Sequence, residues 1–476
     1  MSARYITTTL PYVNADPHIG FALEIVKADV MARLWTLQGD EVFFNTGTDE
    51  HGQKLWQEAV KRGIEPQEYV DEYAAKFKLL KEKLNLYPGL HFIRTTDPHH
   101  VSAAQEFWTR CAANGDIYKK NYQIKYCVGC ELEKTDSELI DDCCPLHPNA
   151  KLEIIDEENY FFKFSKYQQS LLDLYKARPD FVLPNFRLNE VKLFVERGLQ
   201  DFSISRLKEK MPWGINVPGD SDHVMYVWFD ALINYISTLG WPEDLQNFEK
   251  FWGTQERPNA LQFGGKDNLR QQSVMWQAML MSAGLPNSKQ VLIQGFVMSG
   301  GQKMSKSLGN VINPFELVEK YGTDAVRYVL LRHTSAYEDS DLTLEAIHEH
   351  YTANLTNGLG NLVARVMKLS EDYDVVTVIV ERIKQSSSSQ IKSFEFNEAM
   401  NLIWSRIQRL DLRIAEEEPY KIIKTDLVKG KVLIQFMVSE LFEIAKDLAP
   451  FMPETSEKII QTVKENKKPE NLFPRI

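Results

Sequence analysis

The sequence has no long hydrophobic run and no N-terminal targeting pattern. No stretch approaches the roughly 18 consecutive apolar residues that a membrane helix needs. The first residues also lack the basic segment, apolar run and small-residue cleavage site of a secretory signal. A membrane-spanning or secreted protein is therefore not expected, and we predict a cytoplasmic protein without membrane contact.

Positive charge is also scarce, because the 476 residues carry a formal net charge of -11. Proteins that coat nucleic acids rely on Lys and Arg to contact phosphates, so the balance argues against that class. The negative net charge is still compatible with a local basic surface. The content of 43% hydrophobic and 25% charged residues is ordinary for a globular protein, and the length suggests about three structural units.

Cysteine is rare, and four of the five cysteines crowd into one short stretch. Cys127 and Cys130 are separated by two residues, and so are Cys144 and His147. Two such pairs can close tetrahedrally on one Zn²⁺, for which thiolate and imidazole are suitable ligands. We predict a structural zinc site at Cys127, Cys130, Cys144 and His147. Cys143 is an alternative to Cys144, and a metal-free loop with reduced thiols is the other reading.

Strand and helix patterns alternate at the start of the chain. Residues 5–10 are β-branched and apolar, and residues 17–37 have helical periodicity, with Asp16 before Pro17 as the expected helix start. A second strand at residues 41–45 leads into Gly47–Gly52. This alternation predicts an α/β fold with a Rossmann-like parallel sheet.

Later segments divide the chain further. Residues 226–230 and 291–295 are predicted to be strands, so the middle of the chain forms an insertion in one nucleotide-binding domain. Beyond about residue 350 the pattern is helical, interrupted by a loop at Ser386–Ser389. The expected parts are the first half of the α/β domain (1–116), an insertion (117–222) with a zinc knuckle (127–147), the second half of the α/β domain (223–295), a connecting region (296–350), and an all-α bundle (351–476).

The segment Lys303-Met304-Ser305-Lys306-Ser307 follows two glycines. Two lysines in such a loop can swing onto a triphosphate, and the serine hydroxyls add donors. Charge-assisted contacts there would stabilise a pentavalent phosphorus and a departing pyrophosphate. An exposed basic turn is the alternative.

The segment Pro17-His18-Ile19-Gly20-Phe21 lies at the predicted start of the first helix. Free N–H groups and the helix dipole favour anions at such a position. His18 can donate to an α-phosphate, and Gly20 allows a base or ribose to approach the backbone. An ordinary capping or packing histidine is the alternative.

In this order, the two segments resemble the HIGH and KMSKS signatures of class I aminoacyl-tRNA synthetases. The segments Thr9–Asn14, Gly47–Gly52, Tyr226–Ala231 and Gly265–Asp267 resemble methionyl-tRNA synthetases, and the resemblance extends from residue 3 to about residue 430. It implies adenylation of L-methionine by ATP with Mg²⁺, transfer to tRNA(Met), and an anticodon-binding helical bundle. We expect a monomer, because the chain stops soon after the helical part.

The resemblance also assigns roles to individual residues. It implies that His18, Lys303 and Lys306 are catalytic and that Asp49 holds the α-ammonium group of methionine. It implies ATP contacts for His18, Gly20, Phe21, Lys303, Ser305, Lys306 and Ser307, and methionine contacts for Leu10, Tyr12, Asp49, Trp228, Ala231, Leu232, Tyr235, Asp267 and Gln272. It implies anticodon contacts for Asn361, Arg365 and Tyr420.

The chain departs from the family pattern at Tyr420, where the family has a stacking Trp, and at four positions of the catalytic part. Phe21 replaces the last histidine of the first signature, so one expected ATP donor is missing. Asn268 stands where the family usually has an aliphatic residue, and Gln271 and Gln272 stand where it has Phe and His. We expect Gln272 to hydrogen-bond the pocket tyrosine.

Two other functions remain open at this point. One is a class I synthetase for leucine, isoleucine or valine, although such enzymes carry an editing insertion larger than the one here. The other is a zinc-bearing tRNA-binding protein that has lost catalysis.

Overall fold

The computed structural model describes residues 2–129, 132–134, 138–148, 152–304, 309–375 and 388–476. Its centre is a parallel six-stranded sheet with the order β3-β2-β1-β12-β13-β7. This confirms the predicted Rossmann-like fold. The strands are β1 (Ala3–Thr7), β2 (Glu41–Thr48), β3 (Leu90–Arg94), β7 (Val182–Leu183), β12 (Ala260–Gly265) and β13 (Gln290–Gln294).

The strand order reverses direction between β1 and β12. The chain moves outward from β1 through β2 to β3, and it later adds β12 and β13 on the other side of β1. A sheet of this kind leaves a crevice at the carboxyl ends of the strands where the order reverses. Connecting helices are α1 (Ile19–Leu37), α2 (Gln53–Arg62), α3 (Pro66–Lys83) and α4 (Pro98–Ala113).

Helix α1 begins later than the sequence predicts. Its N-cap is His18, whose Nδ1 accepts a hydrogen bond from the Gly20 N–H at 3.1 Å. The prediction that Asp16 starts the helix is therefore wrong. An imidazole nitrogen can satisfy a free N–H of the first turn in the way that an oxygen side chain does, which the usual residue preferences do not anticipate.

The described residues of the insertion form two small antiparallel sheets, two α-helices and the 3-10 helix η2. One sheet has the order β5-β4-β6-β8 and the other β10-β11-β9. Strand β7, which lies within residues 117–222, pairs with β13 and so belongs to the main sheet. The elements are β4 (Ile117–Cys127), β5 (Leu132–Lys134), β6 (Glu153–Phe162), η2 (Phe164–Tyr167), α5 (Gln168–Ala177), α6 (Asn185–Glu196), β8 (Phe202–Ser203), β9 (Ser205–Leu207), β10 (Asn216–Val217) and β11 (Asp220–Met225).

The segment predicted as a strand at residues 226–230 is helical. Tyr226 is the N-cap of α7 (Val227–Ala231), and α8 (Asn234–Ser237) and α9 (Leu245–Phe251) follow. A short apolar run does not distinguish a buried strand from a buried helix, which explains the wrong prediction. The strand predicted at residues 291–295 is confirmed as β13. Between β12 and β13 in the chain come η3 (Lys266–Asn268), η4 (Gln271–Met275) and α10 (Trp276–Ser282).

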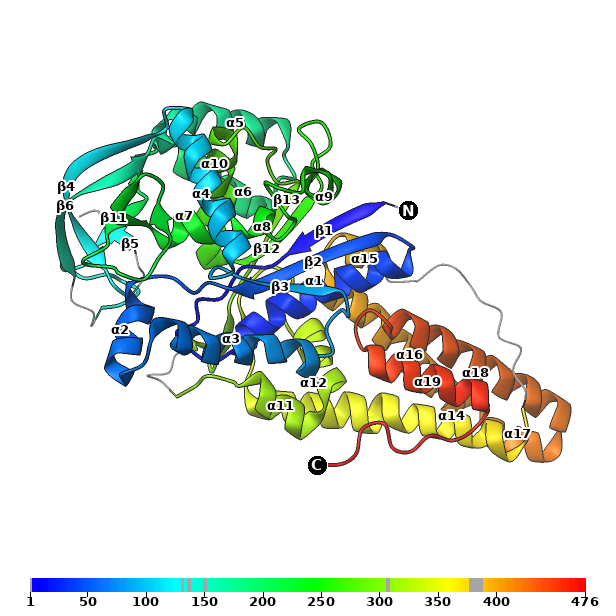
Figure 1. Cartoon of the computed structure of the whole chain (residues 1–476). Coiled ribbons are helices and arrows are strands. Elements are labelled where there is room, and N and C mark those ends of the chain that lie inside the picture. Colours follow the sequence, from blue (N-terminus) through cyan, green and yellow to red (C-terminus); the bar gives the residue numbers. More distant parts are fainter. Residues whose placement is uncertain (1, 130–131, 135–137, 149–151, 305–308, 376–387) are drawn as a thin grey trace.

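The remainder is mostly helical, as predicted. Helices α14, α16, α18 and α19 pack together and extend away from the sheet (Figure 1). A continuous hydrophobic core connects them to α1 and the sheet. The elements are β14 (Val297–Ser299), β15 (Gln302–Lys303), α11 (Pro314–Tyr321), α12 (Thr323–Arg332), β16 (Ser340–Asp341), α13 (Leu344–His350), η6 (Tyr351–Gly360), α14 (Asn361–Asp372), α15 (Ser388–Lys392), α16 (Phe396–Glu417), α17 (Pro419–Thr425), α18 (Leu427–Leu448) and α19 (Pro453–Glu465).

Two further observations concern predicted features. Ser388 and Ser389, predicted to lie in a loop, begin α15, whereas Ser386 and Ser387 lie outside the described residues. No helix in the described part of the chain has the length and apolar character needed to cross a membrane.

Candidate active site

A cleft of about 460 Å³ lies where the strand order reverses. The end of β12, the start of α1, the loop after β2, α7 and the β14–β15 hairpin all contribute to its walls. His18 and Lys303, which are far apart in the sequence, both line it. The two segments singled out in the sequence therefore face the same space.

The N-cap geometry sets the protonation of His18. Because Nδ1 accepts from Gly20, the proton of a neutral ring is on Nε2, which leaves that N–H available to the cleft. Desolvation by the surrounding protein lowers the pKa of His18, and Lys303 lowers it further, whereas Asp267 raises it. A Cβ on Gly20 would lie 3.0 Å from His18 Cε1, so glycine lets the ring occupy this position.

Phe21 also lines the cleft, but its ring is 8% exposed and packs edge-on against Phe77, with 5.5 Å between centroids. A phenyl ring offers no hydrogen-bond donor. The position that differs from the family pattern therefore contributes an apolar wall.

A tight hairpin carries Lys303 to the mouth of the cleft. Gly300 and Gly301 have φ angles of 63° and 72° at the two turn positions between β14 and β15. Two positive φ angles in succession favour glycine. Lys303 Nζ lies 4.3 Å from the ring centroid of Phe296. Ser305, Lys306 and Ser307 lie outside the described residues.

Phe296 contacts a second lysine from the other side of the site. Lys266 Nζ lies 4.4 Å from its ring centroid and forms an ion pair with Asp339 at 2.6 Å. Lys303 forms no such ion pair with any residue in the described ranges. Its ammonium group is held by an aromatic face and remains available to an anion.

The residues predicted to bind methionine also line the cleft. Asp49 is 7% exposed, pairs with Tyr12 in a β-bridge, and its N–H donates to Pro11 O at 3.0 Å. This backbone pairing places a buried carboxylate beside aromatic side chains. The cleft is lined by all of the predicted methionine residues, namely Leu10, Tyr12, Asp49, Trp228, Ala231, Leu232, Tyr235, Asp267 and Gln272.

Gln272 makes the expected hydrogen bond to the pocket tyrosine. Its Nε2 donates to Tyr235 Oη at 3.2 Å and lies 3.4 Å from Phe263 O. A Cβ on Gly264 would lie 2.7 Å from Nε2, so the side chain passes directly over that glycine. Gln272 is 1% exposed, and burial raises the pKa of Tyr235. A neutral, polar pair therefore forms the inner wall.

Glu24 is a residue of this site that the sequence reasoning missed. It lines the cleft one helical turn after Gly20, and its Oε1 accepts from Thr9 N at 2.8 Å and Thr9 Oγ1 at 2.5 Å. Burial raises its pKa to about 7, against the effects of Thr9 and Lys27. A charged residue four positions after Gly20, on the same face of the helix, was the available signal.

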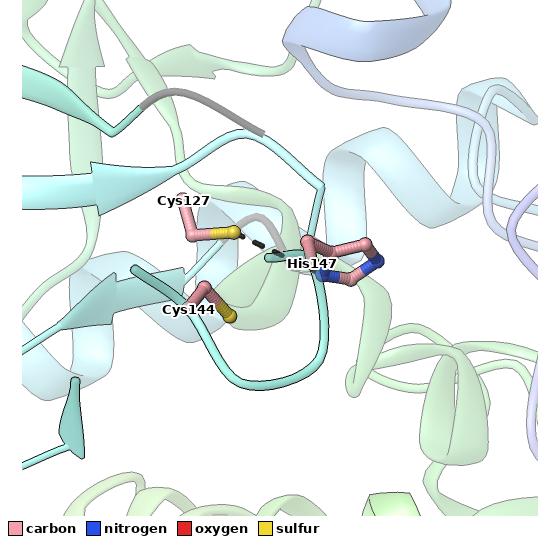
Figure 2. A group of neighbouring side chains, drawn as sticks. All are labelled: Cys127, Cys144 and His147. Carbon is pink, nitrogen blue, oxygen red and sulfur yellow. Dashed lines mark hydrogen bonds between the residues drawn. The ribbon is translucent and has the colours of Figure 1, made fainter. Parts of the chain in front are cut away.

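Three of the four predicted zinc ligands lie together. The ligand atoms of Cys127, Cys144 and His147 all lie within 4.8 Å of one another, at the end of β4 (Figure 2). Cys127 Sγ and His147 Nδ1 are 3.9 Å apart. A Cβ on Gly129 would lie 2.6 Å from His147 Cγ, so the turn accepts the ring only with glycine there. Cys130 lies outside the described residues.

The arrangement of Cys127, Cys144 and His147 is better suited to binding a metal ion than to forming hydrogen bonds among the three side chains. Two thiols and an imidazole at such spacing are suited to Zn²⁺. Burial lowers the pKa of His147, as do Lys54 and Lys303, which favours the neutral ring that a metal requires. Cys144, and not Cys143, belongs to the group.

The predicted anticodon residues lie on the helical part. Asn361 begins α14 and is exposed, and the Arg365 guanidinium forms an ion pair with Asp411 at 2.7 Å. Tyr420 is 40% exposed on α17, and its hydroxyl donates to Glu418 at 3.1 Å. These side chains are accessible from solvent and do not belong to the cleft.

Comparison with known proteins identifies one family by its model and by its members. A family model described as "tRNA synthetases class I (M)" matches residues 4–153 and 135–367. A methionine–tRNA ligase from Thermosynechococcus vestitus is 42% identical over 475 residues, with 95% of this chain and 88% of the relative aligned. One from Thermotoga maritima is 39% identical, with 98% of this chain and 76% of the relative aligned.

A solved structure is similar over the whole length. Mycobacterium tuberculosis methionyl-tRNA synthetase, solved in complex with methionyl-adenylate, superimposes with a TM-score of 0.90 at 32% identity, and the alignment covers 100% of both chains. The similarity therefore includes the cleft, the insertion and the helical part.

Proposed function

The chain belongs to the class I tRNA synthetases of the methionine type, and on that basis we propose that it joins L-methionine to tRNA(Met) with ATP. In the first step a carboxylate oxygen of methionine bonds to the α-phosphorus, and the bond to the β-phosphate oxygen breaks. In the second step the terminal hydroxyl of the tRNA attacks the acyl carbon, and AMP leaves. We place this reaction in the cytoplasm, where these substrates meet.

The observation that carries this proposal is that His18 and Lys303 line one cleft. His18 presents a neutral Nε2–H, which donates to an α-phosphate oxygen as negative charge grows there. Lys303, with Lys306, neutralises the pyrophosphate as it departs. Donors aimed at developing charge in a partly enclosed site stabilise the transition state more than the ground state. No protein nucleophile is needed.

Methionine recognition is assigned to the inner part of the cleft. The Asp49 carboxylate attracts the α-ammonium group, and the aromatic walls of Tyr12 and Trp228 enclose the side chain. An apolar slot with few polar groups suits a flexible thioether. The Gln272–Tyr235 pair closes the end of the slot with neutral groups.

Two metals enter this proposal in different roles. Zn²⁺ would be held by Cys127, Cys144 and His147, with Cys130 as the fourth ligand, and would stabilise the knuckle. Mg²⁺ would accompany ATP and neutralise phosphate charge. The binding of tRNA is assigned to the helical part, where Asn361, Arg365 and Tyr420 would contact anticodon bases by hydrogen bonding and stacking.

The test is pyrophosphate exchange into ATP that depends on an added amino acid. We expect exchange with methionine and much less with leucine, isoleucine or valine. His18→Ala and Lys303→Ala should each lower the exchange rate by about 10²–10³-fold, because each removes a transition-state donor. His99→Ala and Lys320→Ala, at exposed positions outside the cleft, are the matched controls.

Two results would contradict the proposal. Exchange that is faster with another apolar amino acid would reassign the substrate. Absence of exchange with every amino acid, combined with retained tRNA binding, would indicate a binding protein.

A further inference from the structure

A second cavity, of about 430 Å³, lies at the opposite edge of the main sheet from the cleft. Its lining includes Arg4 of β1, Leu261 of β12 and Gln290 of β13, all at the amino ends of their strands. Met31 and Trp35, near the carboxyl end of α1, form another wall. We call this cavity the amino-edge pocket. The cleft and the amino-edge pocket thus lie at opposite ends of α1.

The rim of the amino-edge pocket is cationic. Arg4, Lys289 and Lys392 line it, and no Asp or Glu is among its described lining residues. Arg4 forms an ion pair with Asp40 at 2.9 Å. The ammonium groups of Lys289 and Lys392 form neither ion pairs nor side-chain hydrogen bonds within the part of the chain that the structure describes. Within the described residues, neither of these two ammonium groups is therefore held by an ion pair.

Lys289 is also crowded by other cations. Burial lowers its pKa, and Arg4 and then Arg178 lower it further, whereas Asp180 acts in the opposite direction. Bringing like charges together in a partly desolvated place is unfavourable unless an anion compensates them. The rim therefore offers a favourable position for a negative group.

The floor of the amino-edge pocket is apolar and firmly held. Met31, Leu261 and Phe394 are 2%, 4% and 6% exposed, and the indole of Trp35 lies beside them. The Tyr337 hydroxyl donates to Ser393 O at 2.8 Å, which fixes the segment that carries Phe394. An apolar floor with a few charged groups at the rim is typical of small-molecule sites, which have volumes of roughly 300–1,000 Å³.

We propose that the amino-edge pocket binds a small phosphate ester with a planar ring, of the nucleoside monophosphate class. The phosphate contacts Lys289, Lys392 and Arg4, and the ring packs against Trp35. A ring without charge would leave the lysines without an anion, and a bare phosphate would leave the partly exposed Trp35 ring without a contact. This site is separate from the cleft and does not depend on the reaction proposed for it.

The experiment uses AMP as the probe and the full chain with its cleft occupied. A non-hydrolysable methionyl-adenylate analogue is first titrated to saturation by calorimetry. Binding of AMP is then measured by equilibrium dialysis, with adenosine and ribose 5-phosphate as ligands that lack the phosphate or the base. We expect one AMP per chain and binding at least about tenfold weaker for each of the other two, because each loses one kind of contact.

A charge-reversing variant locates the site. Lys289→Glu combined with Lys392→Glu should weaken AMP binding at least about tenfold, and binding of the analogue in the cleft should not change. The matched control is Lys458→Glu combined with Lys464→Glu, two exposed lysines of α19, which should leave AMP binding unchanged. Equal weakening in both double variants would overturn the proposal, because it would reflect overall charge.

Two further results would also overturn it. One is the absence of AMP binding once the analogue fills the cleft. The other is adenosine or ribose 5-phosphate binding as tightly as AMP. If the analogue itself fails to bind, the proposed function is in question, and the dialysis with AMP still tests the amino-edge pocket through the charge-reversing variant.

Discussion

His51 Nδ1 lies 3.1 Å from Asp230 Oδ2, and the two side chains are 7% and 0% exposed. His51 follows Asp49 by two residues, and Asp230 follows Trp228 by two residues. This one buried contact therefore joins the loop that carries the proposed ammonium ligand to the helix that carries an aromatic wall.

Loss of this contact should weaken methionine binding selectively. Asp230→Asn removes the negative charge that faces His51, so the two walls are no longer held by a charge-assisted hydrogen bond. We expect the KM for methionine to rise about tenfold in pyrophosphate exchange, with a much smaller change in the KM for ATP. Asp222→Asn, at an exposed position on β11, serves as the control. Equal changes in both KM values would indicate a general loss of structure.

Stability should depend on pH through Glu24. Its pKa is about 7 in the folded protein against an ordinary value of 4.5. Between these values the folded state binds more protons than the unfolded state, so the contribution of Glu24 to stability is lost as pH rises from about 5 to about 7. The side chain introduced by Glu24→Gln does not titrate. The unfolding free energy of this variant should therefore fall by about 2 kcal/mol less than that of the unchanged protein over this interval.

The measurement is urea unfolding of both proteins at several values between pH 5 and pH 7. Lys27, whose pKa is lowered by burial to about 7, remains largely protonated over most of this interval and contributes little to the difference. Parallel pH dependences for the two proteins would contradict the prediction.

Substitutions of the two adjacent cysteines, Cys143 and Cys144, should have different effects on the zinc content of the protein. Cys144 lies in the ligand group, whereas Cys143 does not. We expect Cys144→Ser to lose most of its zinc and to unfold at a lower temperature, because a structural zinc stabilises the segment around it. Cys143→Ser should keep its zinc and its melting temperature. Metal analysis and thermal unfolding test this, and zinc loss from Cys143→Ser alone would reverse the assignment.

The packing of the helical part against the sheet should be stabilised by Arg327. Its guanidinium pairs with Asp29 at 2.7 Å, with both side chains fully buried, and also donates to Phe451 O at 2.7 Å and Pro450 O at 3.0 Å. Arg327→Met removes the fully buried partner of Asp29 and leaves Arg33, 2.8 Å away, as its remaining ion pair. We expect a loss of about 3 kcal/mol in unfolding free energy, the lower end of the cost of breaking a buried pair, because Arg33 still compensates part of the charge.

Urea unfolding measures that loss, with Arg475→Met as the control. Arg475 is exposed near the carboxyl end, so its substitution should change stability by less than about 0.5 kcal/mol. A loss for Arg327→Met no larger than for the control would show that the pair contributes little.

Local sequence patterns predicted the parallel sheet and the helical structure beyond about residue 350. They failed where tertiary contacts decide the local structure. Residues 227–231 form a helix because they follow β11 and pack into the core beside the cleft, whereas their apolar run alone fits either a strand or a helix. His18 became the N-cap because its ring nitrogen reaches the Gly20 N–H, which depends on side-chain geometry.

The sequence by itself determined the chemistry available to this protein: the segment Pro17–Phe21 with its histidine and glycine, the lysine-bearing segment after two glycines, and the cysteine pairs. These features are local, since each depends on residue type and spacing over a few positions. Only the tertiary structure decided that His18 and Lys303 share a cleft, that Glu24 lines it, and that Lys289 and Lys392 border a second cavity. Those relationships arise from the strand order of the sheet, which brings distant segments together in a way that local spacing does not encode.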